Sequence, residues 1–297
     1  MSATPPPDGR VPLAALRRRA AGIGIPREVL LLGLLWLVAF GPMVQPLFHA
    51  GAPRMALTDA LVTEGDVKID GYLVGIDRAE RDGHVYSDKA VGQELLAAPV
   101  YVAARAVGAE SAAVPRVREN LTLWWVTLWS AGLPFVALIA MVAVASARRG
   151  TPIPTTGLAI LMFGSMLLPF SVTLYGHVLG AALGFGAWLV LDGDDRPHGR
   201  AWLAGGLIGV AVLVEYQVAI VALILAAALA LARRWGDLGR YVAAGAPFGL
   251  VLAVYQHAAF GSPFRSGYGT KAVHEGASSF VTGIPRFTTA WSFLFGS

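Results

Sequence analysis

The dipeptide Asp88-Lys89 combines two residue types that suit a reaction at a phosphate group. A carboxylate can take a proton from a hydroxyl group, and a neighbouring ammonium can hold a lipid phosphate as a point charge. The pair follows the turn dipeptide Asp82-Gly83 and precedes an amphipathic segment that would lie along a membrane. A second interpretation stays open, in which Lys89 only anchors the chain at a lipid surface.

Glu215 and His177 are two further candidates, because each interrupts a long apolar run. An acid between apolar half-runs is costly unless it reaches water or a partner, which makes Glu215 a candidate site residue. A structural ion pair or a solvated hairpin tip is the alternative for Glu215. For His177 two interpretations stay open: a structural histidine that forms a hydrogen bond at a helix end, or a residue of the functional site.

A polar loop over residues 51–120 must position the Asp88-Lys89 pair. Segments 54–62 and 93–106 suit short interfacial helices. The alternating stretch 67–72, together with the turn at Asp82-Gly83, predicts a small pair of strands. Most of the acids in this loop are expected to be solvated surface groups.

The composition of the 297-residue chain is that of a membrane protein. Hydrophobic residues make up 56% of it, charged residues 14%, and the mean hydropathy is +0.60. The basic residues flank apolar runs, so they are explained by orientation in a bilayer, and nucleic acid is not an expected partner. The absence of cysteine excludes thiolate metal sites and cysteine nucleophiles.

The apolar runs predict an all-α polytopic membrane protein of about seven transmembrane helices, with the N-terminus in the cytoplasm. The predicted organisation is a basic cytoplasmic tail over 1–28, a transmembrane module over 29–260 with its external loop at 51–120, and an external segment over 261–297. The predicted spans are 29–50, 121–147, 157–175, 176–191, 201–214, 217–232 and 241–260.

The segment Tyr86-Ser87-Asp88-Lys89-Ala90 resembles the Tyr-Phe-Asp-Lys-Pro segment in the first external loop of GT-C fold glycosyltransferases, which include protein mannosyltransferases and aminoarabinose transferases. The order of elements around it is similar, with Gly65-Asp66 and Asp82-Gly83 in the expected places. Val214-Glu215-Tyr216 and the segment 260–269 resemble segments of uncharacterised bacterial members. The superfamily usually continues with further spans, which is compatible with a truncated core.

This resemblance implies an inverting-type transfer of a sugar from a polyprenyl-phosphate donor to a lipid, glycan or protein acceptor at the outer face of the cytoplasmic membrane. It gives the role of base to Asp88 or Asp70. Better-known members carry an Asp-Glu pair after the first span, where this chain has Gly51-Ala52-Pro53-Arg54, so the choice of base stays open. Lys89, with Arg54 or Arg265, would neutralise the phosphate, and Tyr268 and His177 would line the sugar pocket, with Glu215 nearby.

Two other functions are compatible with the sequence. A transporter or lipid flippase would use Glu215 as a proton or ion relay. A non-catalytic scaffold of the cell envelope would need none of these roles. No cofactor is predicted; a divalent metal is possible, but no histidine pair has ligand spacing on one helix, so no metal site is predicted.

Overall fold

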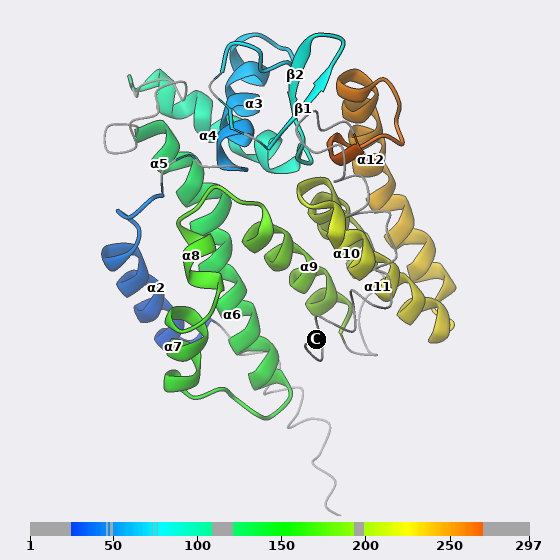
Figure 1. Ribbon diagram of the computed structural model, residues 1–297. Helices are drawn as coiled ribbons and strands as arrows, with labels where there is room; N and C mark the ends of the chain where they lie inside the picture. Colours follow the sequence, from blue (N-terminus) through cyan, green and yellow to red (C-terminus); the bar gives the residue numbers. More distant parts are fainter. Residues whose placement is uncertain are drawn as a thin grey trace, which may run out of the picture.

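The computed structural model describes residues 25–269 except 46, 48–49, 73, 76, 109–120 and 193–198. Most of the predicted basic tail and residues 270–297 of the predicted external segment therefore lie outside the described residues. The described chain has two parts (Figure 1): a cap at the top of the view, made of residues 51–108, and a layer of helices below it.

The cap consists of two helices and a hairpin. Helix α3 (Gly51–Thr63) packs against α4 (Gly92–Ala106). The segment of chain that connects these two helices contains strands β1 (Arg78–Arg81) and β2 (His84–Ser87), which pair with each other in antiparallel orientation. Both residues of the connecting turn have positive φ, 53° at Asp82 and 80° at Gly83. That backbone matches the right-handed twist of paired strands, which explains the Asp-Gly dipeptide.

The predicted features of the polar loop are confirmed in part. Helices form over both predicted segments, and the turn lies at Asp82-Gly83 as predicted. The first strand was misplaced, because β1 begins at Arg78, whereas the alternating stretch 67–72 contributes one bridge, from Lys68 to Tyr86. Helix α3 is buried over its first ten residues and is therefore part of a protein core rather than a helix lying on a surface.

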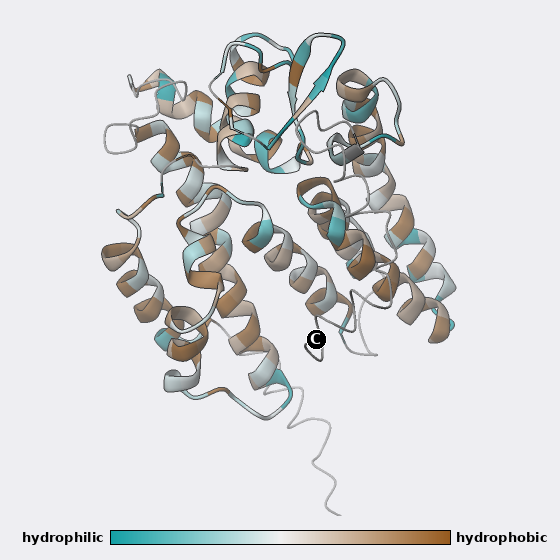
Figure 2. Cartoon of the chain, viewed as in Figure 1, coloured by the Kyte–Doolittle hydropathy of each residue, from teal (hydrophilic) through white to brown (hydrophobic). Residues whose placement is uncertain are grey.

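The helix layer carries most of the apolar surface, which Figure 2 shows as brown residues along the lower helices, while hydrophilic residues are frequent in the hairpin. Its described elements are α2 (Arg27–Ala39), α5 (Leu121–Thr127), the π-helical turn η2 (Leu128–Gly132), α6 (Leu133–Arg148), α7 (Thr155–Phe163), α8 (Leu167–Ser171), α9 (His177–Leu191), α10 (Gly199–Val214), the 3₁₀ turn η3 (Tyr216–Val218), α11 (Ala219–Leu231) and α12 (Trp235–Phe260).

The prediction of about seven transmembrane helices, and with it the GT-C-like core, is wrong. Among the described residues, two helices are long and apolar enough to cross a bilayer: the continuous helix Leu121–Arg148 and α12. Three other apolar helices have only 10 to 17 residues. At 1.5 Å per residue these are shorter than the roughly 30 Å of a hydrocarbon core.

The physical reason is that helix breakers divide the apolar runs. Helix α2 ends at Ala39, just before Gly41 and Pro42, and a residue before proline disfavours the helical conformation. The predicted span 157–175 is divided into α7 and α8, with Gly164 as the C-terminal cap of α7. Hydropathy measured how apolar these runs are, but not where each helix stops.

The cap rests directly on the ends of α10 and α12. A buried core joins Leu57 and Tyr86 of the cap to Leu213 of α10 and Phe260 of α12. At Gly92 a Cβ atom would lie 2.5 Å from the backbone carbon of Leu213. The first turn of α4 and the last turn of α10 are therefore in backbone contact, which only glycine permits at this position.

Candidate functional site

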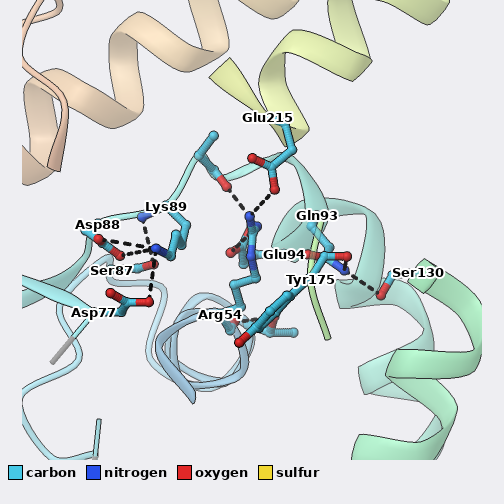
Figure 3. Close-up of polar contacts among 12 residues, drawn as sticks. Arg54, Asp77, Ser87, Asp88, Lys89, Gln93, Glu94, Ser130, Tyr175 and Glu215 are labelled. Carbon is cyan, nitrogen blue, oxygen red and sulfur yellow. Dashed lines mark hydrogen bonds and ion pairs between the residues drawn. The ribbon is translucent and has the colours of Figure 1, made fainter. Parts of the chain in front are cut away.

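Arg54 lies at the centre of a buried ion-pair network between the cap and the helix layer. Its Nη1 donates to Glu94 Oε1 of α4 at 3.2 Å, and its Nη2 donates to Glu215 Oε1, just after α10, at 2.8 Å. His177, the first residue of α9, places its Nδ1 3.5 Å from the same Glu215 oxygen. We call Arg54, Glu94, Glu215 and His177 the Arg54 centre; Figure 3 shows Arg54 between Glu94 and Glu215.

Burial and charge act in opposite directions in the Arg54 centre. Burial alone would lower the pKa of Arg54, but the carboxylates of Glu94 and Glu215 outweigh it and raise the pKa of Arg54 above its usual value. Burial raises the pKa of Glu94 to about 7, and the Arg54 guanidinium offsets only part of that rise. Arg54 therefore stays charged, and Glu94 can take up a proton near neutral pH.

A second group of polar residues surrounds Lys89. Its Nζ lies 3.3 Å from Asp77 Oδ2 and 3.3 Å from Asp88 Oδ1, and 5.3 Å from the centre of the Tyr268 ring. That ring distance is within the range of a cation–π contact. We call Asp77, Asp88, Lys89 and Tyr268 the Lys89 centre; Figure 3 shows Lys89 between its two carboxylates.

The two centres adjoin each other. Arg54 Nη1 also donates to the carbonyl of Ala90, the residue after Lys89, at 3.4 Å. Tyr268, in the turn η4 (Gly267–Gly269), interacts electrostatically with Arg54 and Glu215 as well as with Lys89. Six residues named from the sequence, Arg54, Asp88, Lys89, His177, Glu215 and Tyr268, thus come together although they are up to 214 positions apart.

Asp70 and Arg265 lie elsewhere. Asp70 is partly exposed beside the hairpin, where its carboxylate accepts from the Val85 amide at 2.5 Å and pairs with His84 Nδ1 at 2.7 Å. The Val85 amide and then His84 lower the pKa of Asp70, so this carboxylate is a brace of the hairpin and a weak base. Arg265 is exposed, and its backbone amide donates to Ser262.

Three residues at the site were not singled out from the sequence. Asp77 was counted among the solvated acids of the loop, and Glu94 is an acid in the first turn of a helix, which is a common and uninformative position. Gln93 donates to Ser130 Oγ at 3.1 Å and to the Tyr175 carbonyl at 3.3 Å. An acid and an amide side by side at the start of the helix after Asp88-Lys89 was the signal that could have found Gln93 and Glu94; no such signal marks Asp77.

The contacts of Glu215 favour the structural ion pair over the ion relay. Its carboxylate is bound to a buried arginine and packs against the N-terminus of α9, where a Cβ atom at Gly176 would lie 2.4 Å from Glu215 Oε1. In the described part of the chain, no group of three or more metal-ligating side chains is present.

Replacing Glu94 with glutamine is expected to flatten the pH dependence of stability. The folded state keeps the Glu94 proton up to about pH 7, whereas the unfolded chain loses it near pH 4.5. The contribution of Glu94 to the free energy of unfolding is therefore full below pH 4.5 and is lost as the pH rises through 7. Thermal unfolding in detergent between pH 4.5 and 8 measures the slope, with Glu80→Gln, an exposed hairpin acid, as control. Equal slopes for wild type and Glu94→Gln would contradict this assignment.

Comparisons of the chain with protein-family models, with curated proteins and with solved structures found no match. The residues of the two centres define a class of site: a largely buried cluster of four acids with Arg54, Lys89, His177 and Tyr268, at the junction of a polar cap and an apolar helix layer.

Proposed function

We propose that the chain is a membrane-associated glycosyltransferase that moves a sugar from a polyprenyl-phosphate donor to an acceptor at the outer face of the cytoplasmic membrane. The observation that carries the proposal is the Lys89 centre, in which one ammonium lies between two carboxylates and beneath a tyrosine ring. Those groups supply a phosphate contact, a base and a surface on which a sugar can stack.

The place of the Lys89 centre supports a lipid-linked donor. The centre lies where the polar cap meets the ends of α10 and α12, because Ser87 beside it accepts from Tyr255 of α12 and Gly92 just after it contacts Leu213 of α10. A donor can therefore put its sugar phosphate against the cap and its chain along apolar helices. Large apolar side chains are exposed on these helices, Leu250 and Val254 of α12 and Leu223 and Ile224 of α11 among them. An extended exposed apolar surface marks a membrane or protein contact.

The two basic residues near Asp88 each contact two carboxylates, but they differ in exposure and in what they join. Only 3% of the Arg54 side chain is exposed, and its carboxylate partners lie in the cap and just after α10, so its charge holds the cap on the helix layer. The Lys89 side chain keeps 10% of its surface exposed. Lys89 is therefore the phosphate contact in this proposal.

The proposal is tested by incubating the purified chain with labelled polyprenyl-phosphate mannose, glucose or arabinose and a total lipid extract as the source of acceptors. Transfer of label from any donor to an acceptor supports it. If no label moves from any of the three, and none of the donors binds, the transferase assignment fails and a non-catalytic role is favoured.

Replacing Lys89 with methionine is expected to lower donor affinity and the transfer rate by about 10²-fold, because the charged contact to the phosphate is lost. Binding of polyprenyl-phosphate mannose to the protein in nanodiscs measures the first effect. Lys68→Met is the matched control, because Lys68 is an exposed lysine of the same cap that pairs with Asp66. Equal donor affinity for wild type and Lys89→Met would exclude Lys89 as the phosphate contact.

A further inference from the structure

Asp77 is the acid of the Lys89 centre that can meet an acceptor from solution. We propose that Asp77, which no sequence motif marks, is the general base of the transfer and that Asp88 positions Lys89. This inference rests on the proposed function and specifies the base of that same site.

The first argument is the difference in exposure between two carboxylates that share one ammonium. Both lie 3.3 Å from Lys89 Nζ, yet 22% of the Asp77 side chain is exposed, against 0% for Asp88. A general base must come within about 3 Å of the hydroxyl whose proton it takes. Asp77 therefore presents carboxylate surface to an acceptor in solution, whereas Asp88 presents none.

The second argument is that backbone covers Asp88. A Cβ atom at Gly267 would lie 2.4 Å from the Asp88 Cα and 2.9 Å from its Cβ, so the turn η4 packs directly on this residue. The preceding Ser87 is held as well, because Tyr255 Oη donates to its carbonyl at 3.1 Å. Asp88 is thus fixed from both sides and suited to orienting Lys89.

The chemistry of the step follows from these positions. The acceptor oxygen attacks C1 of the sugar while its proton passes to the Asp77 carboxylate. The bond from C1 to the phosphate oxygen breaks, and its electron pair stays on polyprenyl phosphate, whose added charge Lys89 balances. The products are the glycoside, with inverted configuration at C1, and polyprenyl phosphate, and the proton on Asp77 is later lost to solvent.

The test compares Asp77→Asn, Asp88→Asn and Glu80→Gln in the full chain, with labelled polyprenyl-phosphate mannose, glucose or arabinose and a lipid extract. Asp77→Asn is expected to reduce kcat by about 10²- to 10⁴-fold, since a base acts on the acceptor. Its effect on donor affinity is expected to be much smaller and to come from the lost ion pair with Lys89. Asp88→Asn is expected to act mainly by raising the KM for the donor, because it loosens Lys89. Glu80→Gln, an exposed acid of the same hairpin, is expected to behave as wild type.

Each outcome decides one of the two proposals. If wild type transfers sugar and Asp77→Asn keeps a similar kcat, the assignment of Asp77 is overturned while the glycosyltransferase stands. If wild type transfers no sugar from any donor, the proposed function fails and the role of Asp77 as its base fails with it. Loss of kcat in Asp77→Asn that far exceeds the change in donor binding, with wild-type thermal stability, supports the assignment.

Discussion

Arg54→Met is expected to destabilise the protein by about 3–5 kcal/mol at neutral pH, which is the usual cost of removing one partner from a buried ion pair. Methionine fills a similar volume, so the loss is that of the charge. Glu94 and Glu215 would then be left in a nearly dry site, with side chains 0% and 9% exposed, without the cation that joins them. Because Arg54 ties α3 to α4 and to the end of α10, the cap should loosen first.

The same variant should recover stability as the pH falls. Without Arg54 the two carboxylates can become neutral only by binding protons, and Glu94 already does so near pH 7 in the intact network. The difference in unfolding temperature between wild type and Arg54→Met is therefore expected to shrink from pH 7.5 to pH 5, as followed by tryptophan fluorescence in detergent. Arg78→Met removes a partly exposed arginine paired with Glu80 and should cost about 0–1 kcal/mol. A difference that stays constant or grows towards acid would show that Arg54 does not stabilise these carboxylates.

The sequence allowed the local structure of the cap to be predicted because the signals there are local. Asp82-Gly83 can adopt positive φ at both positions, so the hairpin turn follows from two adjacent residues. The helix after Asp88-Lys89 follows from the amphipathic spacing of its own residues. In the structure Lys89 contacts the Tyr268 ring and His177 contacts Glu215. The roles of these four residues in a reaction are proposals.

The lengths of the helices and the partners of the charges could not be predicted in the same way. Helix length depends on breakers such as Gly41-Pro42 and Gly164, whose effect a hydropathy average removes. The partner of Glu215 is Arg54, 161 positions away, and only the folded chain shows that the two meet. Asp77 and Asp70 are both acids of one polar loop, and only tertiary structure separates the one beside Lys89 from the one that braces the hairpin.

Gly92→Ala is expected to separate the cap from the helix layer and, under the proposed function, to remove most sugar transfer. Its new methyl group would meet the carbonyl carbon and oxygen of Leu213 and the amide nitrogen of Val214 at 2.5 to 2.6 Å. Backbone atoms cannot rotate away as a side chain can, so α4 must move relative to α10, at a cost of about 1–3 kcal/mol. Glu94 and Glu215 lie just beyond this contact, so the movement would stretch the ion pairs of Arg54 and displace Lys89.

Gly199→Ala is the matched control, because Gly199 is also the first residue of a helix but has open space where its Cβ would lie. There alanine should be neutral or should stabilise by up to about 1 kcal/mol, through its higher helix propensity. Thermal unfolding of both variants, together with donor binding, separates a steric effect at Gly92 from the general effect of losing a glycine. Equal stability of the two variants would mean that α4 can move away from α10 at no cost, and the Arg54 centre would then not depend on this contact.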